Sequence, residues 1–235
     1  MFRRLPTACA ACALALATVT PSRADQSWTG ATSTDWFTAG NWSTAVPTGT
    51  DHVTIDTVNP NATVVGTPGA TAISVIVGNT ATGMLTIQNG GTVSSGGGGD
   101  IGAFSGSTGA VTVTGAGSSW TTNSTGLGVG LGGTGTLTIQ NGGTVSSNGN
   151  TATIGLNFGS TGNVTVTGAG SSLTTNSHLL DIGHGGTGTL TIQNGGTVSS
   201  GGGNIGFNSG STGTVTVAGA GSSLTTSSGG LDVGL

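Results

Sequence analysis

One stretch of eleven residues, LTIQNGGTVSS at positions 85–95, recurs unchanged at 137–147 and 190–200. A second module, VTVTGAGSSW at 111–120, alternates with it and returns in close copies at 164–173 and 215–224. Both modules open with an apolar-Thr-apolar triplet, and successive triplets start 26, 26, 27, 26 and 25 residues apart. A period this regular, with no helical spacing inside it, predicts a stack of similar coils, the β-solenoid.

Within each coil the residues alternate as in short strands. In the stretch 137–140 we expect Leu137 and Ile139 to face inward and Thr138 and Gln140 to face solvent. Gly142 and the glycine after it then permit a corner. A recurring Ile/Val-Gly dipeptide predicts about seven parallel coils, at Val77, Ile101, Val129, Ile154, Ile182, Ile205 and Val233.

Other residues also recur in register. Asn89, Asn141 and Asn194 stand at the Gly-Gly corner of alternate coils, where they could form a ladder or favour left-handed turn geometry. We favour the turn, because the intervening coils carry glycine at that place. Three phenylalanines follow the Ile-Gly column in alternate coils and are expected to pack over corners: Phe104, Phe158 and Phe207.

Charge excludes several functions. All three cations, Arg3, Arg4 and Arg23, and both cysteines lie within the first 24 residues, and residues 25–235 keep seven Asp. A chain without cations cannot neutralise phosphates, which argues against nucleic-acid partners. It is also not attracted to anionic membranes, and we expect no direct membrane insertion.

The first 70 residues differ from the rest. Residues 1–24 carry a basic start, an apolar run and small residues before Asp25, which predicts a cleaved signal peptide and export. Residues 25–70 contain Trp28, Trp36 and Trp42. We expect these residues to cap the solenoid, whose repeats fill 71–235; the alternative is an aromatic sugar-binding platform.

Groups for catalysis are scarce. The position before the Ile/Val-Gly dipeptide is Asp100, Asp181 and Asp232 in three coils, and Asp181 and Asp232 lie two coils, about 10 Å, apart. That spacing is near the roughly 6.5–9.5 Å between the carboxylates of an inverting glycosidase. Parallel β-helix enzymes place acids in this way, so a polysaccharide-acting enzyme is the alternative function. The simpler interpretation is that three outward positions happen to be Asp, and we predict no enzyme and no catalytic residues.

Metal and cofactor sites are not expected either. His52, His178 and His184 lack the regular spacing of a zinc site. The Gly-rich stretch before Asp100 resembles half of a calcium-binding repeat, but later coils have Thr153 and Asn204 at the matching place. No Lys-Ser/Thr follows the Gly-rich loops, so they do not resemble a phosphate cradle.

The motif GTGTLTIQNGGTVSS…IG…GSTGTVTVTGAGSSW resembles the repeat of autotransporter (type V secretion) passengers and of some PEP-CTERM-associated exported proteins. The opening Trp28-Thr-Gly…Trp36…Asn41-Trp42 is similar to the start of such passengers. The resemblance implies a right-handed β-solenoid exported beyond the outer membrane of a Gram-negative cell, and it carries no catalytic residues over. We therefore expect a secreted or surface-displayed structural or adhesive rod that contacts surface glycans or other cell-surface molecules.

The family's members end in a translocator barrel or a sorting tail, and residues 231–235 fall inside a repeat. The sequence thus predicts an N-terminal fragment of a longer passenger, periplasmic if no translocator is supplied. An uncapped last coil would expose inward residues and strand edges, so end-to-end self-association is a further expectation.

Overall fold

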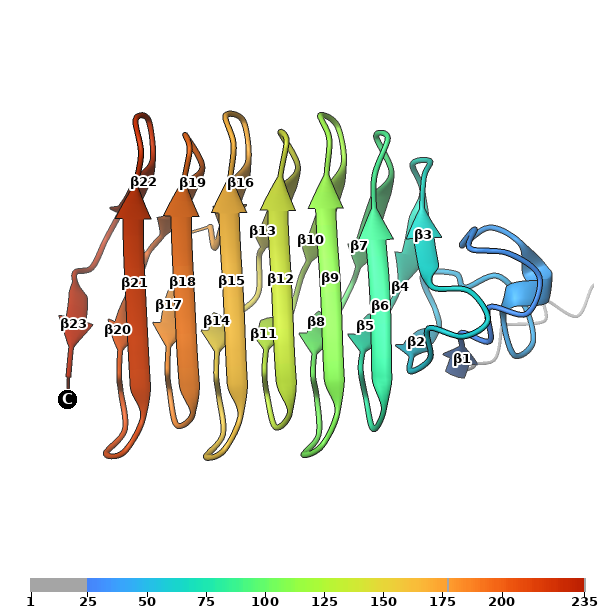
Figure 1. Cartoon of the computed structure of the whole chain (residues 1–235), viewed down its shortest axis with the longest axis horizontal. Helices are drawn as coiled ribbons and strands as arrows, with labels where there is room; N and C mark the ends of the chain where they lie inside the picture. The colour runs from blue at the N-terminus through green and yellow to red at the C-terminus, as the bar shows by residue number, and fades with distance from the viewer. Residues whose placement is uncertain (1–24, 177, 235) are drawn as a thin grey trace, which may run out of the picture.

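The computed structural model describes residues 25–176 and 178–234, and the expected signal peptide lies outside these ranges. The described chain is all-β apart from one short 3-10 helix, η1 (Ala39–Asn41). Its strands form three parallel sheets that run the length of a β-solenoid, as the repeat predicts (Figure 1).

The nine-stranded sheet contains β1 (Asp25–Ser27), β2 (His52–Ile55), β5 (Ser74–Val77), β8 (Gly98–Ile101), β11 (Gly126–Val129), β14 (Thr151–Ile154), β17 (Leu179–Ile182), β20 (Gly202–Ile205) and β23 (Leu231–Val233). The long-strand sheet contains β3 (Thr63–Val65), β6 (Thr82–Ile87), β9 (Thr108–Thr114), β12 (Thr134–Gln140), β15 (Thr161–Thr167), β18 (Thr187–Gln193) and β21 (Thr212–Ala218). The short-strand sheet contains β4 (Ala70–Ala72), β7 (Thr92–Ser95), β10 (Ser119–Thr122), β13 (Thr144–Ser147), β16 (Ser172–Thr174), β19 (Thr197–Ser200) and β22 (Ser223–Thr226).

Seven coils each supply one strand to every sheet, from β2–β3–β4 to β20–β21–β22, and β1 and β23 extend the nine-stranded sheet at its ends. The expected number of about seven coils is therefore confirmed. The Ile/Val-Gly column reached this number in a different way, because it left out the coil that begins with β2 and counted the single strand β23 as a coil. That column missed the first coil because Ile55 is followed by Asp56 instead of glycine. The stacked sheets thus begin within residues 25–70, where β2 pairs with β5 and β3 with β6.

The expected facing of the strands is confirmed. Leu137 and Ile139 are fully buried, whereas Thr138 and Gln140 are half-exposed. The strands β6, β9, β15 and β18 repeat this alternation in register with β12. The inward residues of all three sheets form one continuous hydrophobic core along the axis. The core is held by dispersion and by removal of apolar surface from water.

The Asn-Gly corners are turns. Asn141 and Gly142 have φ of 54° and 84°, and the amide of Gly143 donates to the carbonyl oxygen of Gln140 at 3.0 Å. Two consecutive residues with positive φ define a type I′ turn, which Asn and Gly adopt at the lowest cost. The preference for a turn role is thus confirmed, although Asn141 also donates to the Thr114 hydroxyl of the previous coil.

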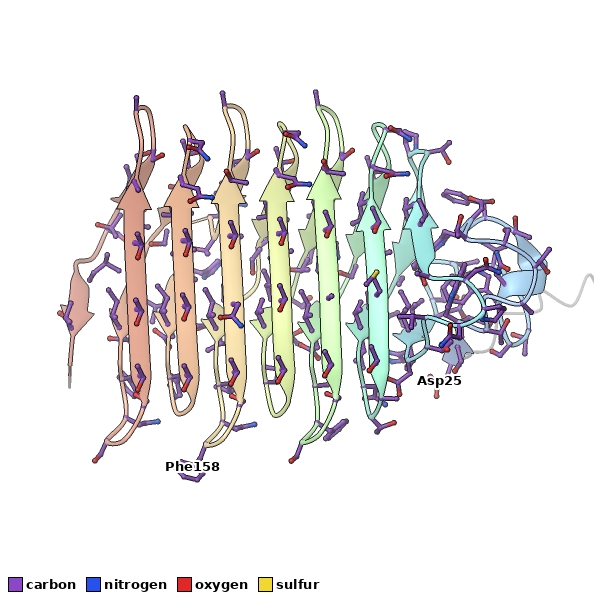
Figure 2. The ribbon with its side chains drawn as sticks, in the orientation of Figure 1. Asp25 and Phe158 are labelled. Atoms are coloured by element: carbon purple, nitrogen blue, oxygen red, sulfur yellow. The ribbon has the colours of Figure 1, made fainter. Side chains whose placement is uncertain are left out.

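Close approach of neighbouring coils explains the Ile/Val-Gly column. Gly155 has φ of +74°, and a Cβ there would overlap the backbone carbonyl of Thr187 in the next coil. Only glycine meets both conditions. The three phenylalanines near this column do not share one role: Phe104 and Phe158 are 60% and 92% exposed, so the expectation that they pack over corners is wrong for both. Phe158 projects away from the stack in Figure 2.

Three tryptophans close the N-terminal end of the core. Trp28 and Trp36 each pack edge to face on Trp42, with ring centroids 5.0 and 4.7 Å apart. All three are at most 5% exposed. The buried Asn41 side chain fixes the surrounding loop by accepting the amide protons of residues 32 and 33. These rings offer no exposed face on which a sugar could stack, so the geometry fits the cap and not the sugar-binding platform.

Inward residues on opposite walls of a coil are matched in size. In the β8–β9–β10 coil, Trp120 points at Gly99, where a Cβ would overlap the indole ring. The next coil has Leu127 and Val145 in the same two places, as the strand register shows. Further coils carry other pairs at these places: Ala152 with Leu173, Leu180 with Val198, and Gly203 with Leu224. Each coil therefore fills a similar volume, but the larger of the two inward side chains comes from one sheet in some coils and from the other sheet in others.

This matching predicts a strong coupling between positions 99 and 120. Trp120→Val should lower the free energy of unfolding by about 3–5 kcal/mol through the cavity it leaves. Gly99→Leu alone should also destabilise, because the side chain meets the indole. The double variant reproduces the Leu/Val pair of the next coil and should be more stable than either single variant in urea unfolding. Additive losses would contradict the matching.

Candidate functional site

The outward side of the long-strand sheet is an array of threonines. Two columns are Thr in all six strands from β6 to β21. They are Thr82, Thr108, Thr134, Thr161, Thr187 and Thr212, and Thr86, Thr112, Thr138, Thr165, Thr191 and Thr216. A middle column contains Met84, Ala110, Thr136, Asn163, Thr189 and Thr214. We call these three columns the threonine face.

The threonine face is open and uncharged. None of its residues is buried, and none is ionisable. In the described part of the chain, its threonine hydroxyls make no side-chain hydrogen bond. The six strands lie side by side with the same direction in Figure 1, and Figure 2 shows their side chains in rows. The face therefore presents many hydroxyls, each able to donate and to accept, in a repeating arrangement.

The outward column of the nine-stranded sheet carries the aspartates. The register places Asp181 opposite Asn204, and Asn204 opposite Asp232, as the sequence predicted. Asp100 stands three strands earlier in the same column, opposite Gly128. The column therefore exists, but its three carboxylates are separated by other residues.

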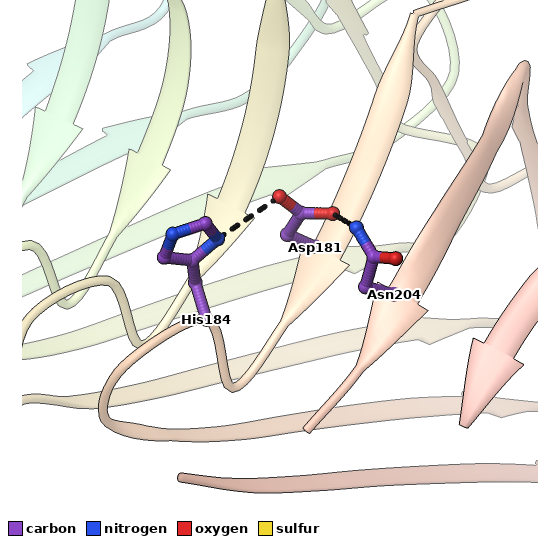
Figure 3. Close-up of polar contacts among 3 residues, drawn as sticks. All are labelled: Asp181, His184 and Asn204. Atoms are coloured by element: carbon purple, nitrogen blue, oxygen red, sulfur yellow. Dashed lines mark hydrogen bonds and ion pairs between the residues drawn. The ribbon is translucent and has the colours of Figure 1, made fainter. Parts of the chain in front are cut away.

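Asp181 is held in a local network. It is only 5% exposed, its Oδ2 lies 3.1 Å from Nδ1 of His184, and its Oδ1 accepts a 2.6 Å hydrogen bond from Nδ2 of Asn204 (Figure 3). The His184 ring also stacks on Phe207 of the next coil, with centroids 4.7 Å apart. Both carboxylate oxygens of Asp181 are thus engaged.

Sequence reasoning named Asp181 and His184 separately and missed this network. The signal was present, because His184 follows Asp181 by three residues and Asn204 occupies the same column one coil later. Asp232, its proposed partner in an inverting pair, is exposed and lies one strand beyond Asn204. Within residues 25–176 and 178–234, no three His, Cys, Asp or Glu side chains are grouped to hold a metal ion.

A groove of about 530 Å³ opens near the N-terminal end of the nine-stranded sheet. Its lining includes Asp25, Trp28, His52, Asp56 and Asn79. The sequence did not predict it, because it depends on β1 joining the sheet beside β2.

Asp56 has a structural role in this groove. Its carboxylate accepts hydrogen bonds from the backbone amides of Asn79, Thr80 and Ala81 and from the Thr80 hydroxyl. Burial opposes ionisation of Asp56, but these hydrogen bonds outweigh it and lower the pKa. Asp56 thereby holds the corner at residues 79–81 of the next coil.

Asp100 is the carboxyl with the opposite shift. Asp100 lies beside Gly128 of the next strand. A Cβ on Gly128 would meet both the Leu131 side chain and the carboxylate of Asp100, so leucine and carboxylate lie close together over this glycine. Burial raises the pKa of Asp100 to about 6. A half-buried carboxyl beside leucine and glycine serves no visible chemistry, and its ionisation costs stability.

The raised pKa of Asp100 predicts that the effect of replacing this residue on the free energy of unfolding depends on pH. Its folded-state pKa exceeds the usual 3.8, so the protonated carboxyl favours folding below about pH 4 and this contribution is lost as the pH rises through about 6. At neutral pH, Asp100→Asn should raise the free energy of unfolding by about 1–2 kcal/mol, with little change near pH 4. Urea unfolding at both pH values checks this, with Asp232→Asn as an exposed control. An equal effect at both pH values would contradict the assignment.

Across the described residues, no helix is long and apolar enough to cross a membrane. Comparisons of the chain with protein-family models, with curated proteins and with solved structures find no match.

Proposed function

We propose that this protein is an exported, surface-displayed structural and adhesive rod, and that the threonine face is its adhesive surface. The observation that carries the proposal is the extent of that face. The same outward residue type recurs through six coils, on a side of the molecule where threonine is not needed for the core. Many weak and identical contacts add up to firm attachment to an extended surface, although each contact alone is weak.

The rest of the molecule is consistent with display. The core runs without interruption from the tryptophan cap to the last coils, so the stack is a stiff support for its outer faces. The signal-like residues 1–24 and the resemblance of the repeat to autotransporter passengers favour export to the cell surface. The groove near β1 and the network around Asp181 are local features, whereas the threonine face extends over most of the rod.

The alternative, an inverting glycosidase, receives less support from the aspartate column. Such an enzyme needs one carboxylate as base and one protonated carboxyl as acid, with room for a water between them. Asp181 is buried and engaged by His184 and Asn204, and Asn204 occupies the strand between Asp181 and Asp232. The double variant Asp181→Asn with Asp232→Asn tests this alternative. We expect no turnover of neutral polysaccharides in either the parent protein or the variant, whereas turnover in the parent that the variant loses would favour the enzyme.

Adhesion is tested with residues 25–235 and two insoluble neutral polysaccharides, cellulose and chitin. We expect the folded protein to be retained on at least one of them, to the same extent at low and high salt, because the threonine face is uncharged. Thr138→Tyr with Thr191→Tyr should reduce retention, since two protruding rings separate the face from the surface.

The matched control is Thr144→Tyr with Thr197→Tyr, which places the same rings in the same two coils but on the short-strand sheet. This control should be retained like the parent. Two results would contradict adhesion through the threonine face: loss of retention at high salt, and unchanged retention of the variant with tyrosine at positions 138 and 191.

A further inference from the structure

We propose that the threonine face binds ice, by ordering a layer of water that matches the ice lattice. The inference deepens the proposed function, on which it rests for the identity of the binding face, and names the surface to which the face attaches.

The threonine face is regular in two dimensions. Outward positions repeat about 4.8 Å apart from coil to coil and about 6.6 Å apart along a strand, since every second residue faces outward. All three positions are threonine in β12, β18 and β21, whereas only the two outer positions are threonine in β6, β9 and β15. The strands keep one register from β6 to β21, so the columns do not drift. The array covers about 24 Å along the axis and about 13 Å across it. Oxygen atoms on faces of hexagonal ice also repeat in two directions with spacings of this order.

The threonine side chains of the face are suited to ordering water. Threonine is stiff about its first torsion angle, so its hydroxyl and methyl groups keep nearly fixed positions on a strand. The hydroxyls have no side-chain hydrogen bonds in the described protein and are free to anchor water. The methyl groups cannot bond water, and they leave it to hydrogen-bond with other water molecules between the rows. Ordered water that bridges two surfaces is nearly as favourable as a direct hydrogen bond.

The threonine face lacks the groups that recognise ions or single sugar chains. It carries no charge, so it offers nothing specific to an ionic surface or an acidic polymer. It carries no aromatic ring on which a sugar could stack, and Trp28, Trp36 and Trp42 are buried in the cap. A single sugar chain would also use one direction of the array only. A neutral crystalline surface with two-dimensional order uses both directions, and ice is built entirely from hydrogen-bonding water.

The short-strand sheet provides an internal comparison. Its outward positions alternate between Ser and Thr from one coil to the next, as Thr144 and Ser172 illustrate. It also has only two outward columns, fewer than the three of the threonine face, because its strands have at most four residues. The methyl pattern is therefore interrupted on that sheet, and we assign ice binding to the threonine face alone.

The experiment uses folded residues 25–235, checked for β-sheet circular dichroism, in two assays. The first measures thermal hysteresis, the gap between melting and freezing of a small ice crystal. The second measures whether the fluorescently labelled protein is taken into a growing ice hemisphere. We expect hysteresis and incorporation for the parent, loss of most of both for Thr138→Tyr with Thr191→Tyr, and no change for Thr144→Tyr with Thr197→Tyr. Thr138→Val with Thr191→Val keeps the shape and should give an intermediate result.

A folded parent protein that shows no hysteresis and is excluded from the ice overturns ice binding. If the same protein is still retained on cellulose or chitin through the threonine face, the proposed adhesive function stands without it. Ice activity that survives the tyrosines at 138 and 191, or that is lost in the control pair, also overturns the assignment to this face. If the folded parent protein binds neither ice nor cellulose nor chitin, both proposals are overturned.

Discussion

Constant register between parallel strands one coil apart is the constraint on which the rest of this structure depends. Each strand inside a sheet is hydrogen-bonded to the equivalent strand of the coil before and of the coil after, and pairs such as Leu137 with Val164 recur without a shift. Because side chains alternate with a period of two, a slip by one residue would move every apolar side chain of a strand to the outside. The repeat of about 26 residues places each strand opposite its equivalent in the next coil, and the differences in coil length fall in the corners and leave the register unchanged.

Constant register turns each position of the repeat into a row. Inward rows form the core, where the division of volume varies from coil to coil: Trp120 opposite Gly99 in one coil, and Val145 beside Leu127 in the next. Outward rows are free of that packing requirement. One of them has become a mixed column that includes Asp100 and Asp181, and the long-strand sheet has become the threonine face. Both functional proposals depend on this difference between inward and outward rows. Thr138 and Thr191 contribute little to the core that Ile139 and Ile192 fill, so their side chains are available for binding.

Local periodicity explains which features could be predicted from the sequence. The all-β solenoid, the inward Leu137 and Ile139, the turn role of Asn141 and the aspartate column all follow from alternation and repeat length. The first coil was missed because Asp56 stands where the later coils have glycine, and its carboxylate accepts hydrogen bonds from the amides of residues 79–81. The Asp181–His184–Asn204 network and the groove near β1 depend on side-chain conformations and on a pairing between distant segments. Phe158 was misjudged because an apolar residue in a corner is not obliged to find a partner.

The distance between two ends of one threonine column tests the central claim most directly. Residues 25–235 contain no cysteine, so Thr82→Cys with Thr212→Cys allows two spin labels to be attached on β6 and β21 without other changes. Five steps at constant register predict a single narrow distribution centred near about 24 Å in pulsed electron paramagnetic resonance. A broad distribution, or a centre displaced by one coil spacing of about 4.8 Å or more, would show that the coils are not stacked in register and would contradict the account.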